Sequence, residues 1–311
     1  MTGYLQPWAA VGFVGAVLLV GIYAVAVLDR LIGNAVSGTS TRFATELASP
    51  LRDASLLLLQ RRTESERPDA EAWALAPALL AGLAAVGVAV VPFDSGLAAA
   101  DIESGFVLFA AAVAFVMVAV YLHGWSANST FSIIGGYRFV AAALSYQIPF
   151  LLALLATALP AESLAVGEIV RAQEGLWNVV RQPLGLPLYL VVAAGVSFWG
   201  PLNFPDSAEL GGGTRLEVSG VARLMWVVAR SAMLVAVAVM GAAAFLGGWL
   251  GPILPGPVWM ALKTLVLLLV LTVARHLIAR VRLERFVVVS WAILIPLSLV
   301  DVFASGVLLL L

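Results

Sequence analysis

Residues 139–159 read FVAAALSYQIPFLLALLATAL, a run of 21 residues without a charged side chain. A helix needs about 20 mainly apolar residues to cross a membrane, whereas a strand of an outer-membrane barrel alternates over about ten. Seven further segments meet the helical criterion, which predicts an all-α polytopic membrane protein with about eight transmembrane helices. The expected spans are Trp8–Leu28, Trp73–Val91, Gly105–Leu122, Phe139–Leu159, Leu186–Asn203, Trp226–Leu246, Val258–Leu277 and Phe286–Leu308.

Composition excludes several classes of function. Of 311 residues, 62% are hydrophobic and 11% are charged, far from the balance of soluble domains. There is no Cys and there are two His residues, so we expect no metal site, no bound cofactor and no catalytic residue in this chain. His123 and His276 end two spans, where the helix dipole favours His, and we prefer this explanation to haem ligation. The net charge of -1 without basic runs argues against a nucleic-acid partner.

The charges between the spans predict the orientation. The stretch 29–72 carries six arginines, whereas 93–104 carries Asp94, Asp101 and Glu103 without a basic residue. The positive-inside rule places 29–72 in the cytoplasm, and an even number of spans then leaves both termini extracytoplasmic. The chain begins without a basic, cleavable leader, so the first span is expected to be retained. We expect one membrane domain over residues 1–311.

The long first connection has an amphipathic pattern over residues 42–60. Phe43, Leu47 and Leu51 recur at helical spacing opposite polar positions, which predicts a helix at the cytoplasmic interface. Pro50 is expected to kink or break this helix, which favours docking against other protein over floating on lipid. The candidate residues for docking a hydrophilic partner are Arg42, Glu46, Asp53, Arg280, Arg282 and Arg285.

Four blocks of sequence carry a family resemblance. They read GWSANSTFSIIGGYRFVAAALSYQIP (124–149), FPDSAELGGGTRLEVSG (204–220), FLGGWLGPILPGPVWMALKTLVLLLVL (245–271) and RVRLERFVVVSWAILIPLSL (280–299). In this order they resemble the family of membrane subunit 1, also called the H subunit, of respiratory complex I, the NADH-quinone oxidoreductase, in a divergent bacterial branch. The resemblance covers nearly the whole chain and is weakest over residues 1–41.

The resemblance implies a function and partners. Members of this family have eight helices and an interfacial helix, and they join the membrane arm to the hydrophilic redox arm in the bacterial inner membrane. Ubiquinone or menaquinone enters through a cavity in this subunit as a diffusible ligand, and buried charges couple quinone reduction to proton or sodium translocation. The implied partners are other membrane subunits, hydrophilic redox subunits, the bilayer and quinone.

The family's charged positions are only partly kept. Glu209 and Glu217 match family carboxylates and Asp206 stands at a family Glu, all in an acidic cytoplasmic loop at about 204–225. Gln147 stands where the family usually has Glu, and it cannot hold a proton near neutral pH. Because Pro149 frees a carbonyl one turn back, we expect the Gln147 amide to bridge helices. At three positions where the family usually has a charged residue, this chain has the uncharged Val196, Trp199 and Asn203.

Three other polar residues complete the candidates for a quinone cavity or coupling path. Arg138 starts a span at the inner interface, and Lys263 and Asp301 fall inside spans, where ionisable groups are costly unless they face the bundle interior. Lys263 could instead extend outward to the interface. The alternatives are an anchor subunit of a complex I-related membrane-bound hydrogenase, a structural anchor without coupling, and a stand-alone permease. The sequence shows no internal repeat of the kind expected of a permease.

Overall fold

The computed structural model describes residues 6–39, 43–61, 67–100 and 102–310. These residues form helices α1 (Pro7–Ser37), α2 (Phe43–Leu59), α3 (Ala70–Ala89), α4 (Gly105–Ser126), α5 (Thr130–Ala158), α6 (Val166–Arg171), α7 (Asn178–Arg181), α8 (Gly185–Val196), α9 (Gly220–Phe245), α10 (Gly256–Leu277), α11 (Leu283–Val289) and α12 (Ile295–Leu310). Short turns are η1 (Leu159–Ala161), η2 (Gly200–Leu202), η3 (Ala208–Leu210) and η4 (Gly213–Arg215), and the π-helical η5 (Ser290–Leu294) joins α11 to α12.

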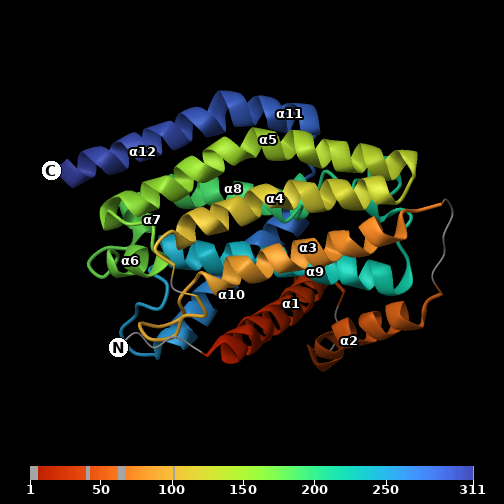
Figure 1. The fold of residues 1–311 in the computed structure, drawn as a ribbon, viewed down its shortest axis with the longest axis horizontal. Coiled ribbons are helices and arrows are strands. Elements are labelled where there is room, and N and C mark those ends of the chain that lie inside the picture. Colours follow the sequence, from red (N-terminus) through yellow and green to blue (C-terminus); the bar gives the residue numbers. More distant parts are fainter. Residues whose placement is uncertain (1–5, 40–42, 62–66, 101, 311) are drawn as a thin grey trace.

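Seven helices in the described residues are long and apolar enough to cross a membrane. They are α1, α3, α4, α5, α9, α10 and the continuous α11–η5–α12 segment, and they lie roughly side by side in one bundle (Figure 1). The all-α, multi-pass prediction is therefore confirmed.

The fifth expected span, Leu186–Asn203, is wrong as a continuous helix. Helix α8 has 12 residues, so it rises about 18 Å, and the hydrocarbon core is about 30 Å thick. At Phe198 the backbone adopts a left-handed φ of 38°. The helix ends there because α-helical backbone cannot continue through this conformation.

An irregular segment continues the path of α8 through the bundle. Gly185 lies against Phe245 at one end of the bundle, and Gly200 lies against Arg275 at the other. Non-helical backbone at membrane depth is tolerated where protein buries it. Phe198 and Trp199 are buried here, so the backbone of the break is shielded from lipid.

Helix α9 forms the centre of the bundle. From Ala229 to Phe245 every residue is buried, because small Ala, Val and Gly side chains face neighbours on all sides. Gly241 shows how closely these neighbours approach, since a Cβ there would lie 2.7 Å from the Tyr189 ring. Helices α3, α8 and α10 pack around α9.

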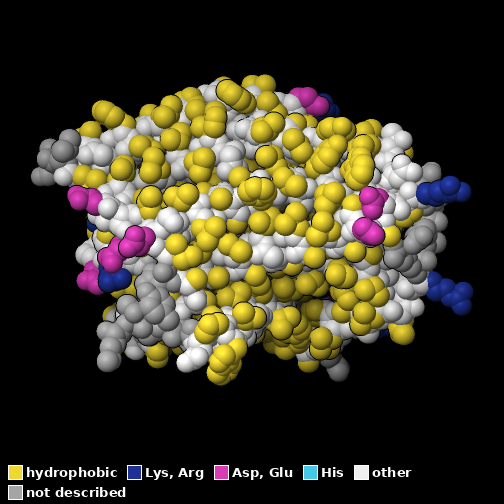
Figure 2. Space-filling view, in the orientation of Figure 1, with side chains coloured by type: hydrophobic (Ala, Val, Ile, Leu, Met, Phe, Trp, Pro, Cys, Tyr) yellow, Lys and Arg dark blue, Asp and Glu magenta, His cyan; other side chains and the backbone are white. Residues whose placement is uncertain are grey.

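The two ends of the bundle differ in charge. We call the end that carries α2, the loop 203–219 and the connection 278–282 the basic end, and the end that carries 90–104, 159–184 and 246–255 the opposite end. Figure 2 shows charged side chains toward the ends of the visible face and a mainly apolar surface between them. The N-terminal end of α1 and the C-terminal end of α12 both lie at the opposite end (Figure 1), as expected for an even number of crossings.

Helix α2 continues through Pro50, so of the expected kink or break the break does not occur. Pro50 cannot donate to the carbonyl of Glu46, but the Ser49 hydroxyl donates to that oxygen at 2.9 Å. Two contacts hold α2 against α1: the Tyr23 hydroxyl donates to the carbonyl of Leu47, and Arg30 pairs with Asp53. The helix therefore lies on protein along one side, in the position shown in Figure 1.

Candidate functional site

Asp206 is the centre of a buried ion-pair network at the basic end. Its side chain is 1% exposed. One carboxylate oxygen accepts a hydrogen bond from the Thr214 hydroxyl at 2.6 Å, and the other lies 3.4 Å from Nη1 of Arg230 and 3.9 Å from Nε of Arg215. A buried carboxylate requires such partners, because its desolvation is otherwise very unfavourable.

The glycine-rich loop folds tightly around this carboxylate. Gly213 has a φ of 56°, and a Cβ there would lie 1.8 Å from the carbonyl oxygen of Pro205, so only glycine fits. The Thr214 amide donates to that same oxygen at 3.0 Å. Asn203 accepts from the Asp206 amide at 3.3 Å. The position that is usually charged in the family therefore helps to orient Asp206.

Arg230 links this loop to the break after α8. Only 4% of this residue is exposed, and its Nη2 donates to the carbonyl of Phe198 at 2.7 Å. Its guanidinium carbon lies 5.0 Å from the Phe198 ring centroid and 4.9 Å from that of Trp199. Cation–π contacts of this kind are stronger when they are desolvated. The left-handed turn at Phe198 thus presents both a carbonyl and a ring to Arg230.

A second ion pair adjoins the first through Trp199. Arg275 lies over the Trp199 ring at 4.3 Å and pairs with Asp29 at 3.2 Å. The other carboxylate oxygen of Asp29 is 2.9 Å from Nε2 of His276. We call Asp29, Trp199, Asp206, Arg230 and Arg275 the basic-end cluster. It joins α1, the break after α8, the acidic loop, α9 and α10.

The cluster is cationic and rich in hydrogen-bond donors. Including Arg215, three guanidiniums share the two carboxylates of Asp29 and Asp206. The Nε atoms of Arg215 and Arg230 and Nε1 of Trp199 are buried and have no hydrogen-bond acceptor among the described residues. Such a site can bind a carbonyl or anionic oxygen, because desolvated donors gain from an added acceptor.

Several expected residues surround this cluster. Arg138 donates to Glu209 at 3.2 Å and to Ser207 at 3.3 Å, so it holds the outer side of the loop. Glu217 lies half-buried in the same loop. Arg280 donates to the backbone carbonyl of Asp206 at 3.4 Å.

The expected docking residues differ in how exposed they are. Arg282 and Arg285 are exposed at the basic end. Asp53 is half-exposed and pairs with Arg30. Glu46 is 7% exposed, which leaves little of it for a partner. Arg42 lies outside the described residues.

Lys263 lies far from the cluster, at the opposite end. Its ammonium donates to the carbonyls of Gly248 and Leu250 at 2.9 and 2.7 Å and lies 4.2 Å from the Trp177 ring centroid. These contacts with two carbonyls and a ring stabilise the 246–255 loop. Lys263 therefore points into protein and does not extend into solvent.

The bridge expected of Gln147 is made by another residue. Pro149 leaves the carbonyl of Ser145 without its helical donor, and the Ser290 hydroxyl donates to that oxygen at 2.6 Å. Gln147 is half-buried and has no hydrogen-bond partner within the described part of the chain. The expectation that Gln147 bridges helices is thus wrong, because the π-helical η5 turns Ser290 toward the freed oxygen.

Sequence reasoning gave too little weight to Asp29, Arg230 and Arg275. Arg230 lies four residues after Trp226, the expected start of its span, so the sequence alone does not distinguish it from an ordinary charge near a span end. Asp29 and Arg275 are at span ends, where charges are ordinary. Their pairing joins residues that are far apart in the chain and required the tertiary structure.

The two histidines behave differently. The His276 ring forms a hydrogen bond with the carboxylate of Asp29. His123 stacks on Trp226 with centroids 3.7 Å apart, and both of its ring nitrogens are buried without a partner. Among the described residues there is no group of three or more His, Cys, Asp or Glu side chains that could hold a metal ion.

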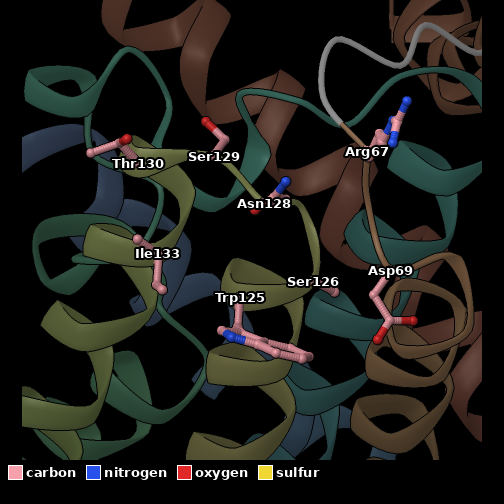
Figure 3. A pocket seen from close by; sticks show the side chains of 8 residues that line it. All are labelled: Arg67, Asp69, Trp125, Ser126, Asn128, Ser129, Thr130 and Ile133. Atoms are coloured by element: carbon pink, nitrogen blue, oxygen red, sulfur yellow. The ribbon is translucent and has the colours of Figure 1, made fainter.

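A hollow of about 470 Å³ also lies at the basic end, between the starts of α3 and α5 and the end of α4. Figure 3 shows Arg67 and Asp69 on one wall and residues 128–133 on the other. Asp69 already caps α3 by accepting from the Ala72 amide at 3.1 Å. The lining combines charged, polar and apolar side chains: Arg67, Asp69, Trp125, Ser126, Asn128, Ser129, Thr130 and Ile133.

The fold and the buried charges define the class: an all-α multi-pass membrane protein with an ion-pair network at one end. A family model described as NADH dehydrogenase matches residues 10–306. The H subunit of the NADH-quinone oxidoreductase of Geobacillus kaustophilus is 33% identical over 89% of this chain and 84% of its own. The H subunit numbered 1 of Rhodopseudomonas palustris strain BisB5 is 32% identical over 79% of this chain and 78% of its own. Its counterpart in Geobacter metallireducens, also numbered 1, is 32% identical over 85% and 84%. The chain belongs to the H-subunit family of NADH dehydrogenases.

Proposed function

We propose that this chain is the membrane subunit of a complex I-type NADH-quinone oxidoreductase in which the basic end meets the hydrophilic redox subunits and forms part of the quinone entrance. The observation that carries the proposal is the basic-end cluster, where Arg230 and Arg275 flank Trp199. The subunit itself supplies binding, orientation and charge, and the redox groups belong to its partners.

The docking part rests on the exposed cations. Arg282 and Arg285 follow α10 directly and lie at the same end as α2 and the acidic loop. Under the positive-inside rule this end faces the cytoplasm of a bacterial plasma membrane, with both termini on the outer side. Other membrane subunits would cover part of the apolar flank of the bundle.

The quinone part rests on donors next to apolar surface. A quinone headgroup presents carbonyl oxygens, which the unpaired donors of Arg230 and Trp199 can bind. Leu51 and Leu58 of α2 are 65% and 57% exposed and offer apolar surface beside this end. A diffusible quinone would reach the cluster from the bilayer along this surface.

The coupling part follows from the charges. Reduction of a bound quinone changes the charge near Asp206 and Arg230. This change in charge would alter the strength of the ion pair between these two residues. Arg138, Glu209 and Glu217 would pass this change to the loop surface and to proton or sodium translocation.

The test compares Arg230→Met with Arg171→Met in the assembled complex. Arg171 pairs with Glu168 on an exposed surface of the opposite end and is the matched control. We expect Arg230→Met to lose at least tenfold in NADH:quinone activity while NADH oxidation by ferricyanide is unchanged. Arg171→Met should keep both activities.

Other outcomes would overturn the proposal. Full quinone activity in an assembled Arg230→Met complex would remove the basic-end cluster from the quinone path. Co-purification with a hydrogenase arm, and no labelling of this chain by a photoreactive quinone, would favour the hydrogenase anchor. Full quinone reduction with unchanged ion pumping in variants of Asp206, Glu209 and Glu217 would favour a structural anchor.

A further inference from the structure

Asp301 is a buried carboxyl that the proposed quinone entrance does not use. It is 3% exposed and belongs to α12, nine residues before the helix ends. That position lies about 13 Å along the helix from its end, level with the start of α8. A Cβ on Gly185 would lie 3.0 Å from its Oδ2 and 2.9 Å from the Phe245 ring, so Asp301 faces the start of α8.

No cation in the described part of the chain compensates this carboxyl. No ion pair among the described residues includes Asp301, and its Oδ2 is buried without a hydrogen-bond donor. An isolated carboxylate buried in protein costs several kcal/mol, so it is expected to be paired or neutral.

The titratable groups of the elements packed on α12 are engaged elsewhere. On α5, Arg138 pairs with Glu209 at the basic end, Tyr137 bonds Tyr121, and the Tyr146 ring packs on Phe286. On α8, the Tyr189 hydroxyl donates to the carbonyl of Val237. The turns η1 and η5 carry no titratable side chain. Arg181, before α8, donates to Asn178.

Gln182 supplies an unpaired acceptor beside the same glycine. Its Nε2 donates to the carbonyl of Ala156 at 2.5 Å, which fixes the amide, and its Oε1 is buried with no donor in the described part of the chain. A Cβ on Gly185 would lie 3.6 Å from the Cβ of Gln182. Asp301 and Gln182, each with a buried acceptor oxygen, thus flank one small residue.

A hollow lies at the opposite end of the bundle, beside the end of α12. Its volume is about 500 Å³, and its lining includes Val180, Arg181 and Leu308. Leu308 lies seven residues after Asp301 and therefore on the same helix face, about 10 Å nearer the end.

We propose that Asp301 is a proton-binding site, held as the neutral acid by Gln182 and filled from the opposite end of the bundle. The two side chains provide too few oxygen ligands for a bound cation, because sodium-sized and larger ions take about six. The site lies in the crossing formed by α5, α8 and α12 and is separate from the basic-end cluster.

The test is infrared spectroscopy of the assembled complex at neutral pH. The difference between the parent and Asp301→Asn should contain the carbonyl band of one protonated carboxyl and no carboxylate bands. The matched control is Asp53→Asn, which removes the half-exposed carboxylate paired with Arg30 and should lose carboxylate bands instead. Loss of carboxylate bands in Asp301→Asn, or sodium-dependent bands, would overturn the proposal.

A second variant keeps the test informative if Asp301→Asn does not assemble. Gln182→Met retains the approximate shape and removes the acceptor, so the carboxyl band should shift in frequency. An unchanged band would overturn the role of Gln182, and the absence of any carboxyl band would overturn the proton site. These bands do not depend on electron transfer, so the result is independent of the quinone proposal.

Discussion

At the scale of residues, the basic-end cluster depends on the pairing of buried Asp206 with Arg230. Asp206 receives a hydroxyl and a guanidinium, and Arg230 has a carboxylate, a carbonyl and two rings. Removing one member leaves its partner charged and buried, which is far more costly than losing an exposed pair. Losing the buried Asp206–Arg230 pair should therefore lower the free energy of unfolding more than losing the exposed Glu209–Arg138 pair of the same loop.

Asp206→Asn is expected to destabilise the subunit by about 3–5 kcal/mol, because Arg230 loses its buried counter-charge. The matched change is Glu209→Gln, since the Glu209 side chain is 69% exposed in its pair with Arg138 and should contribute about 0–1 kcal/mol. Both effects can be measured by heating the purified complex and recording how much of this subunit stays bound. Equal effects would contradict the buried pairing.

At the scale of elements, serine hydroxyls replace hydrogen bonds that prolines remove. In α2 the Ser49 hydroxyl serves the carbonyl of Glu46 below Pro50, and in α5 the Ser290 hydroxyl serves the carbonyl of Ser145 below Pro149. The first replacement is local, whereas the second joins two helices. An interior proline is tolerated in a helix when the freed carbonyl finds another donor.

Ser290→Ala should therefore lower stability by about 1–3 kcal/mol, because the carbonyl of Ser145 is left buried and unsatisfied. Gln147→Leu is the control and should have an effect of less than about 1 kcal/mol, since its amide has no partner to lose among the described residues. Thermal stability of the assembled complex gives the comparison. A larger loss for Gln147→Leu would restore Gln147 as the bridging residue.

The contact between α2 and α9 depends on a glycine. Gly220 has a φ of 57°, and a Cβ there would lie 2.8 Å from the carbonyl of Gln60. Gly220→Ala should displace α2 and cost more than about 2 kcal/mol, whereas Gly211→Ala, with a φ of 61° and only a Leu216 methyl at 3.6 Å, should cost about 1 kcal/mol. Proteolysis near residue 61 reports release of α2. Similar protection in both variants would show that α2 does not need this contact.

At the scale of the whole molecule, the two ends make the topology testable. The chain has no cysteine, so a single introduced thiol can be labelled without background. Ile253 is 87% exposed at the opposite end, and Arg282 is exposed at the basic end.

We expect an impermeant maleimide to label Ile253→Cys from outside intact cells. Arg282→Cys should be labelled only in inverted vesicles, and in the assembled complex it should be protected by the docked hydrophilic subunits. Labelling of Arg282→Cys from outside would invert the orientation. Labelling without protection would move the docking surface away from 276–285.

Local properties of the sequence determined the class of this protein and most of its spans. Apolar length identified seven long helices, since each can satisfy its own backbone in lipid whatever its neighbours are. The amphipathic spacing at 42–60 likewise gave α2. The order of the four sequence blocks gave the family.

Only the tertiary structure decided which charges meet and where a helix must break. Asp29 and His276 pair across 247 positions, and Arg230 meets the carbonyl that the turn at Phe198 exposes. The apolar run at 186–203 gave no sign of this break, because Phe198 and Trp199 are as hydrophobic as helical residues and their conformation is imposed by Arg230 and Arg275. Pairing energies inside a membrane depend on distance between elements, which hydropathy and spacing along one element do not contain.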